Sequence, residues 1–292
     1  MTAQPAPIRR RKLAIRLAEL RKAIPKSQVE TASWTGLSQS TISKIENAAQ
    51  PIEVKHVRLL AQCYGVNSPE VDQLLRMAAE SDDRGLLVDH SDTVPDFARD
   101  YFELEAYAEE LRVHEPGWVF GLFQTPAYIR AVHLDANPDA SEEVLQRFVA
   151  LRIARQERLR AARPLTLRVV LDEGVLHRAI GGPSVMAEQL AHLSEVTELP
   201  SVTLQVVPFA AGSHSALGAG FTVLRFEDTP TMDVVYVENL RTASYLEKPS
   251  DLEYYAQVFQ EITRTALGPD DSRALLDTLR RTLWEQPEGT QA

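Results

Sequence analysis

Residues 27–46 read Ser27-Gln-Val-Glu-Thr-Ala-Ser-Trp-Thr-Gly-Leu-Ser-Gln-Ser-Thr-Ile-Ser-Lys-Ile-Glu46, and they predict two short helices joined by a tight turn. Ser27 and Glu30 have the spacing of a capping box at the start of the first helix. Gly36 stands where the turn needs an unusual backbone angle, and Ser38 is placed to cap the second helix. The pattern predicts a helix-turn-helix, with a structural hairpin of two helices in a bundle as the alternative.

The second of these helices has one apolar and one polar face. Ile42 and Ile45 are three residues apart and face inward. The outward face is short, polar and nearly uncharged, which suits the reading of base edges in a major groove. Its members are Gln39, Ser40, Thr41, Ser43 and Lys44. A structural hairpin has no need for such a polar face, so the pattern favours sequence-specific DNA binding.

The surrounding sequence predicts an all-α domain of five helices over residues 9–80, preceded by a disordered tail at residues 1–8. The first helix spans Arg9 to Ala23 and stops before Pro25. A fourth helix runs from Glu53 to Tyr64, and a fifth begins at Ser68. The helix-turn-helix supplies the second and third.

Composition indicates an ordinary soluble protein with room for two domains: 292 residues, of which 44% are hydrophobic. No apolar run is long enough to cross a membrane, and the first residues lack the apolar core of a secretory signal. Cys63 is the single cysteine, so an internal disulfide and a cysteine-based metal site are excluded. These features predict a cytoplasmic protein.

The charge is distributed unevenly along the chain, whose formal net charge is −10. Residues 1–80 hold twelve Lys and Arg against seven Asp and Glu, a net charge of +5. The remaining residues hold nineteen against thirty-four, a net charge of −15. The basic footprint of a DNA-binding surface is therefore confined to the end that carries the helix-turn-helix. The acidic remainder serves solubility or limits non-specific DNA binding.

The rest of the chain predicts a linker at residues 81–99, an α+β domain with a small mixed sheet at residues 100–285, and a tail at residues 286–292. β-Structure is expected only after the long helix that begins near residue 141. The expected helices are near residues 101–111, 126–132, 141–162, 173–179, 184–197, 250–266 and 271–284, and the expected strands are 165–171, 202–207, 221–226 and 233–237.

Residues 9–80 resemble the DNA-binding domain of XRE regulators, which is lambda-repressor-like, and residues 37–46 follow its recognition-helix pattern closely. The resemblance implies that Gln28 contacts a phosphate and braces Gln39 on a base, expected to be adenine. It also implies that Ser38, at the start of the recognition helix, belongs to the interface. The remaining base and backbone contacts are implied for Ser40, Thr41, Ser43 and Lys44. One departure is Asn47-Ala-Ala-Gln, where the family usually has a glycine, so a differently shaped loop is expected after this helix.

The basic stretch Arg9-Arg-Arg-Lys12 opens the first helix. Arg9, Arg10 and Arg11 are candidates for phosphate contacts, because a polybasic run is otherwise unfavourable at the positive end of a helix. The alternative is a solvated helix start.

The later segments Trp118-Val-Phe-Gly-Leu-Phe-Gln-Thr-Pro-Ala-Tyr, Asp172-Glu-Gly-Val-Leu-His-Arg, Val207-Pro-Phe-Ala-Ala-Gly-Ser-His and Val235-Tyr-Val-Glu238 resemble the C-terminal domain of long XRE regulators from actinomycetes. Some members of that group are antitoxin-like and pair with a small neighbouring protein, and others regulate development or secondary metabolism. A homodimer on an inverted-repeat operator in double-stranded DNA is expected, because one helix-turn-helix module buries little surface and reads few bases. The C-terminal domain is then a sensor or an interaction domain, for a small molecule or a small neighbouring-gene protein.

A possible effector pocket is predicted in this domain, with a buried aromatic core and a plain hairpin connection as the alternatives for its parts. Its candidate residues are Trp118, Phe120, Phe123, His177, His214 and Glu238. Glu173 and His177 are four residues apart and share a helix face, but no third ligand accompanies them, so a surface pair is favoured over a metal site. No metal and no cofactor is expected.

The sequence therefore predicts a transcriptional regulator and not an enzyme. The alternative is an enzyme on a regulator-derived scaffold, with its chemistry in the C-terminal pocket. No Ser/His/Asp or Cys/His set has a nucleophile-elbow or related spacing.

Overall fold

A computed structural model describes residues 8–79, 81, 96–227, 230–240 and 242–285. The chain divides into two compact units. One comprises Met1–Asp89 with Phe102–Tyr107 and Glu227–Met232, and the other comprises the rest. The predicted tail at 286–292, almost all of the tail at 1–8 and most of the linker at 81–99 lie outside the described residues.

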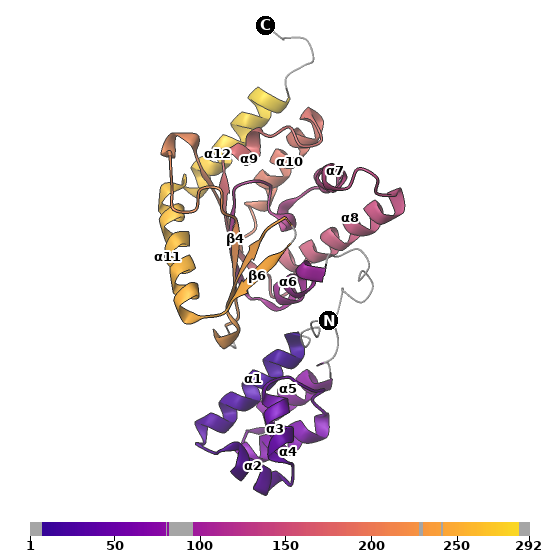
Figure 1. Cartoon of the computed structure of the whole chain (residues 1–292). Helices are drawn as coiled ribbons and strands as arrows, with labels where there is room; N and C mark the ends of the chain where they lie inside the picture. Colours follow the sequence, from indigo (N-terminus) through magenta and orange to yellow (C-terminus); the bar gives the residue numbers. More distant parts are fainter. Residues whose placement is uncertain (1–7, 80, 82–95, 228–229, 241, 286–292) are drawn as a thin grey trace. The chain divides into compact units, whose positions relative to one another are not determined.

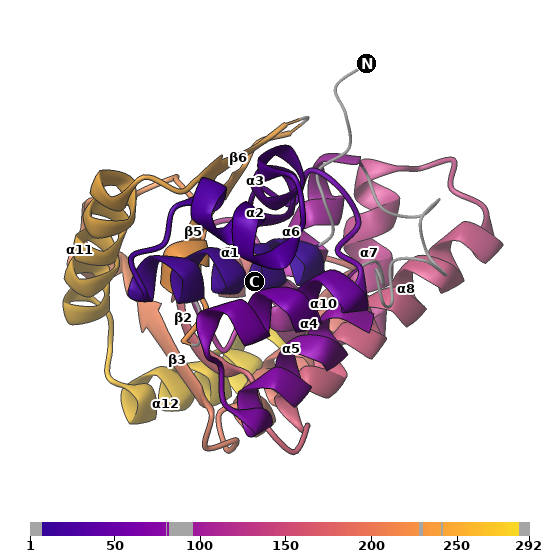
Figure 2. The ribbon, with the colours of Figure 1, turned by 90° about the horizontal axis from the view of Figure 1, so that it is seen from below.

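The first unit contains the five predicted helices. Its helices are α1 (Ile8–Ala23), α2 (Gln28–Thr35), α3 (Gln39–Glu46), α4 (Val54–Tyr64) and α5 (Ser68–Ala79). In Figure 2, α1 runs between the pair α2 and α3 and the pair α4 and α5, and it contacts α3, α4 and α5. The prediction of an all-α helix-turn-helix domain is confirmed.

One apolar core holds these short helices together. Leu13 and Leu17 of α1, Ile42 and Ile45 of α3 and Leu60 of α4 are all completely buried. Because α2, α3, α4 and α5 have only 8 to 12 residues and helices of that length are marginal in water by themselves, this shared core provides most of their stability.

The second unit is built on a six-stranded mixed sheet with the order β3-β2-β1-β4-β5-β6, as far as the described residues go. The strands are β1 (Glu110–Glu115), β2 (Thr166–Asp172), β3 (Val202–Val207), β4 (Phe221–Arg225), β5 (Val234–Glu238) and β6 (Ala243–Leu246). β1, β2 and β3 are parallel, and β4, β5 and β6 continue the other half with antiparallel pairings. An α+β domain with a mixed sheet is confirmed.

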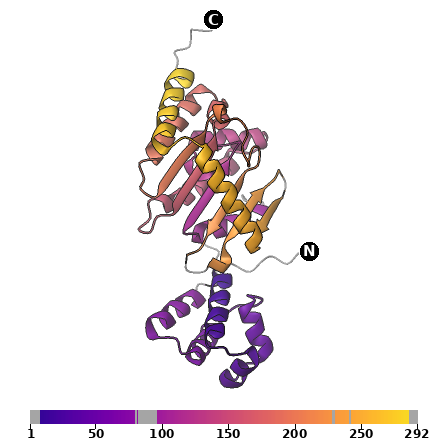
Figure 3. The ribbon, with the colours of Figure 1, turned by 90° about the vertical axis from the view of Figure 1, so that its left-hand side faces the viewer.

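Helices cover the sheet of this unit on both faces. The helices of this unit are α7 (Pro126–Ala136), α8 (Glu142–Gln156), α9 (Gly174–His177), α10 (Pro183–Val196), α11 (Pro249–Thr265) and α12 (Pro269–Leu279). A further helix, α6 (Asp96–Tyr107), is divided between the two units at Tyr101. Figure 3 shows α11 crossing one face, where Val258, Phe259 and Ile262 pack on strand residues such as Val223 and Val235. Figure 1 shows α7, α8 and α10 on the other side of the strands.

Two strands and one boundary differ from the sequence prediction. The predicted helix near 101–111 ends at Tyr107, and β1 follows at once, so β-structure appears before the long helix and not only after it. β6 was also missed. The helix α6 begins at Asp96, inside the predicted linker. β1 is rich in residues that favour helices, and only its pairing with β2 on one side and β4 on the other makes it a strand.

Candidate nucleic-acid interface

The turn between α2 and α3 forms as its capping residues predict. The Ser27 hydroxyl accepts a hydrogen bond from the Glu30 backbone N–H at 3.1 Å, and the Glu30 carboxylate accepts one from the Ser27 N–H at 2.8 Å. Gly36 ends α2 in the left-handed conformation, with φ of 74°. Ser38 caps α3 by accepting from the Thr41 N–H at 3.0 Å. These local bonds set the angle at which α3 leaves the turn.

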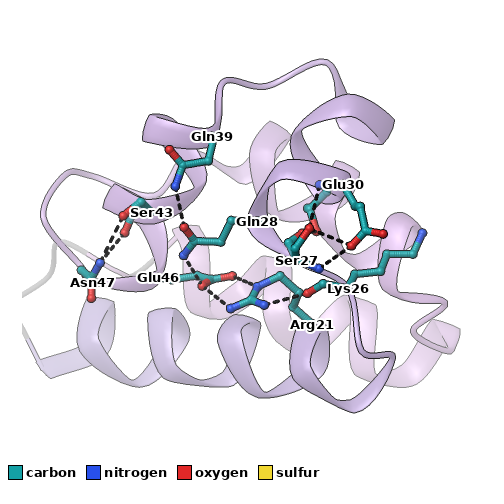
Figure 4. Close-up of polar contacts among 10 residues, drawn as sticks. Arg21, Lys26, Ser27, Gln28, Glu30, Gln39, Ser43, Glu46 and Asn47 are labelled. Atoms are coloured by element: carbon teal, nitrogen blue, oxygen red, sulfur yellow. Dashed lines mark hydrogen bonds and ion pairs between the residues drawn. The ribbon is translucent and has the colours of Figure 1, made fainter.

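A line of four polar side chains, which we call the support chain, connects α1 to the exposed start of α3: Arg21, Glu46, Gln28 and Gln39 (Figure 4). Arg21 donates to both Glu46 carboxylate oxygens, from Nε at 2.6 Å and from Nη2 at 2.8 Å. Gln28 donates from Nε2 to Glu46 Oε2 at 2.8 Å. Gln39 donates from Nε2 to Gln28 Oε1 at 2.8 Å. The support chain therefore anchors the exposed Gln39 to a bidentate ion pair with little solvent exposure.

The support chain also decides which way each amide points. Glu46 is a carboxylate and only accepts, so the Gln28 NH₂ group faces it and the Gln28 oxygen faces Gln39. Gln39 uses one N–H on that oxygen and keeps its own oxygen and a second N–H. Among the described residues, Gln39 makes no other side-chain hydrogen bond. In the major groove adenine presents a donor at N6 and an acceptor at N7. It can therefore bind a side chain that offers an acceptor beside a donor.

The other predicted interface residues surround Gln39 on the same helix. Ser40 and Lys44 are exposed, and Thr41 and Ser43 are partly exposed. The Ser38 hydroxyl lies 2.8 Å from Thr41 Oγ1, so both hydroxyls take part in the cap of α3. Lys44 is the one residue with formal charge in the predicted outward set. The surface is thus polar and of low charge, which suits contacts with base edges.

The predicted basic stretch lies at the start of α1, because α1 begins at Ile8. Eleven residues of helix, roughly 16 Å, separate Arg10 from Arg21 of the support chain. The side chain of Arg9 lies outside the described residues. The basic stretch is therefore well removed from the support chain.

The loop after α3 adopts a turn that usually requires glycine. Ala48 has φ of 53°, in the left-handed region. Its N–H donates to the Ile45 carbonyl at 3.0 Å, and the Ala49 N–H donates to the Lys44 carbonyl at 2.8 Å. Ala48 is buried, and its packing in the core offsets the strain of that conformation. The loop therefore forms a left-handed turn with an alanine where a glycine would be usual.

The roles of Arg21 and Glu46 were not foreseen from the sequence. Glu46 is separated from Arg21 by twenty-five positions and from Gln28 by eighteen. One signal was available: Glu46 directly follows the buried Ile45, so an acidic group stands at the inner edge of α3. An acid in that place needs a basic or hydrogen-bonding partner.

In the second unit, two predicted pocket residues lie near the carboxyl end of β2. His177 Nε2 is 3.2 Å from Glu173 Oε1, and the ring of His177 lies against that of Phe209, with 5.2 Å between centroids. The side chain of His214 is buried, with Nε2 at 3.8 Å from Asp172 Oδ2, and among the described residues neither of its ring nitrogens has a hydrogen-bond partner.

The other four predicted pocket residues have different surroundings. Phe120 and Phe123 are buried in the core, with ring centroids 5.7 Å apart, while Trp118 is half exposed. Glu238 ends β5 and accepts a hydrogen bond from the Tyr236 hydroxyl at 2.6 Å. Within the described ranges, no three His, Cys, Asp or Glu side chains are grouped so that they could hold a metal ion. No helix in the described part of the chain has the length and apolar character needed to span a membrane.

Comparison with known families assigns both units. A family model described as a helix-turn-helix domain matches residues 12–74. A second model, described as a domain of unknown function (DUF5753), matches residues 98–278, which is more than half of the chain. No curated protein and no solved structure matches.

Proposed function

Because this chain belongs to the family defined by the DUF5753 domain and carries a helix-turn-helix domain, we propose that it is a sequence-specific transcriptional regulator of the XRE type. The helix-turn-helix supports DNA binding in general. The support chain carries the finer proposal, because it holds Gln39 with an acceptor and a donor pointing away from the domain.

In the proposed complex, α3 lies in the major groove and Gln39 reads one adenine. Gln28, which is next to Gln39 in the support chain, contacts a phosphate and braces Gln39. Ser40, Thr41, Ser43 and Lys44 supply the remaining base and backbone contacts, and the basic stretch at Arg9, Arg10 and Arg11 adds distant phosphate contacts. A DNA-binding protein of this kind acts in the cytoplasm.

We further propose that two copies bind an inverted repeat. One helix-turn-helix module buries little surface and reads few bases, and two half-sites about one helical turn apart give useful affinity. The acidic DUF5753 domain then dimerises and binds a small-molecule effector or a small neighbouring-gene protein, in an antitoxin-like role. Co-purification with the product of the adjacent gene tests the protein partner.

Replacing Gln39 by alanine is expected to weaken operator binding by about 1–3 kcal/mol and to relax base preference at one position. The reason is that alanine removes the donor and acceptor that Gln39 offers. Fluorescence anisotropy on DNA upstream of the gene, with each base of the half-site varied and salt titrated, measures both effects. The slope of affinity against salt concentration should stay unchanged, because no phosphate contact is lost.

The matched control is Gln62→Ala, which removes an exposed glutamine of α4, outside the helix-turn-helix motif. It should bind as the parent does. Unchanged affinity and base preference in Gln39→Ala would show that the readout is assigned to the wrong residue.

A further inference from the structure

The helix α8 has apolar residues on two sides, of which its own unit covers one. Leu145 and Leu151 are buried against the rest of the unit. On the opposite side lies an apolar strip that includes Ile153, which is 37% exposed. A helix with apolar residues on its solvent side as well as its core side is typical of an element that is buried by a partner.

This apolar strip lines an open hollow of about 400 Å³ along α8, beside α7. Figure 1 shows the two helices next to each other. Arg130 of α7 borders one end of the hollow, near Gln146, and Glu157 borders the other end. The lining residues are Arg130, Gln146, Val149, Ala150, Ile153, Ala154 and Glu157, which we call the α8 face.

The α8 face is complementary to itself when two copies are related by a two-fold axis. If two α8 helices run antiparallel with the axis midway between Ala150 and Ile153, each of these two residues lies opposite the other. By the same count, Val149 lies opposite Ala154 of the second helix. A large side chain thus meets a small one at each step, and the small residues let the helices approach closely.

The polar ends of the α8 face match in the same arrangement. Gln146 of one helix lies opposite Glu157 of the other, so an amide donor faces a carboxylate. Arg130, which holds Glu142 of its own copy at 2.8 Å, borders the Gln146 end and so brings a positive charge towards the same Glu157. Two such contacts form by symmetry, one at each end.

We propose that the α8 face is the surface through which two copies of this chain pair. The second copy is the occupant because size and charge alternate along the α8 face in the way that an antiparallel copy of itself requires. That two copies pair at all rests on the proposed function. The choice of the α8 face rests on residues of the DUF5753 domain alone.

Ile153→Arg in the full chain is the test, and Val144→Arg is its matched control. Val144 is on the same helix, is 36% exposed and does not line the hollow. Light scattering and sedimentation over a concentration series, without DNA, should show dimers for the parent and for Val144→Arg. Ile153→Arg should be monomeric, with dimer affinity at least ~100-fold weaker, because two bulky arginines that carry the same charge meet beside the two-fold axis, where the helices must approach closely. Circular dichroism should show the same fold for all three.

A cross-link tests the register. The double variant Ala150→Cys/Ile153→Cys should form disulfide-linked dimers under mild oxidation, because it places cysteines opposite each other across the axis. Val144→Cys and the parent, whose Cys63 is buried, should stay uncross-linked.

A monomeric parent, a dimer that Ile153→Arg leaves intact, or no cross-link in the double variant would each overturn the proposal. These outcomes are separate from failure of the proposed function, which is decided by whether the parent binds its operator. A folded Ile153→Arg monomer that still prefers the half-site sequence would support both proposals.

Discussion

Replacing Glu46 by alanine is expected to lower the free energy of unfolding of the helix-turn-helix unit by about 3 kcal/mol. Glu46 and Arg21 are 6% and 13% exposed, and the variant leaves the Arg21 guanidinium without its bidentate partner in a poorly solvated place. The Gln28 amide loses its acceptor at the same time. Because Gln28 orients Gln39, base preference in DNA binding should fall together with stability.

Urea unfolding followed by circular dichroism measures the stability change, and anisotropy at a temperature well below the unfolding transition measures DNA binding. Glu53→Ala is the control, because Glu53 is 54% exposed and pairs with Lys55 at 2.7 Å on the surface of the same unit. That variant should lose no more than about 0.5 kcal/mol. If both variants lost the same free energy of unfolding, the support chain would stabilise the unit no more than an exposed ion pair does.

Replacing Glu115 by glutamine is expected to stabilise the DUF5753 domain at alkaline pH. Burial, and then the nearby Glu238 carboxylate, raise the pKa of Glu115 from 4.5 to about 8, against the opposing effect of Arg152. Between these two pH values the folded chain holds a proton that the unfolded chain has lost. Stability of the parent therefore falls as pH rises from about 4.5 to about 8.

The glutamine variant removes this titration, since its amide resembles the protonated carboxyl group and has no proton to lose. Parent and variant should be equally stable near pH 4, and the variant should be more stable by a few kcal/mol at pH 9, given about 1.4 kcal/mol per pKa unit. Thermal unfolding across the pH series measures the difference. Glu143→Gln, at a carboxylate that is 81% exposed, is the control and should track the parent. A Glu115→Gln curve parallel to that of the parent would contradict the raised pKa.

The helix-turn-helix was predictable because its signals are local. Capping by Ser27 and Ser38 and the left-handed Gly36 each involve residues within a few positions of one another. The residue preferences at helix ends are therefore visible in a short stretch of sequence. The buried isoleucines of α3 followed from helical spacing in the same way.

The DUF5753 domain was harder to predict, because its strands depend on partners far along the chain. β1 pairs with β2, more than fifty residues later, and with β4, more than one hundred residues later. Its own residues favour a helix, but the hydrogen bonds and the burial at the centre of the sheet outweigh that preference. Of the predicted pocket residues, Phe123 is buried in the core and His214 lies in the loop between β3 and β4.

The sequence by itself determined the caps, the turn and the polar outer face of α3, because these depend on neighbours in the chain. Only the tertiary structure decided that Glu46 would join Arg21 to Gln28, and so how Gln39 is held. It also decided that α8 would have an apolar face that the described residues leave open. Both outcomes depend on which helices pack together, and packing brings together residues whose separation along the chain carries no signal of their contact.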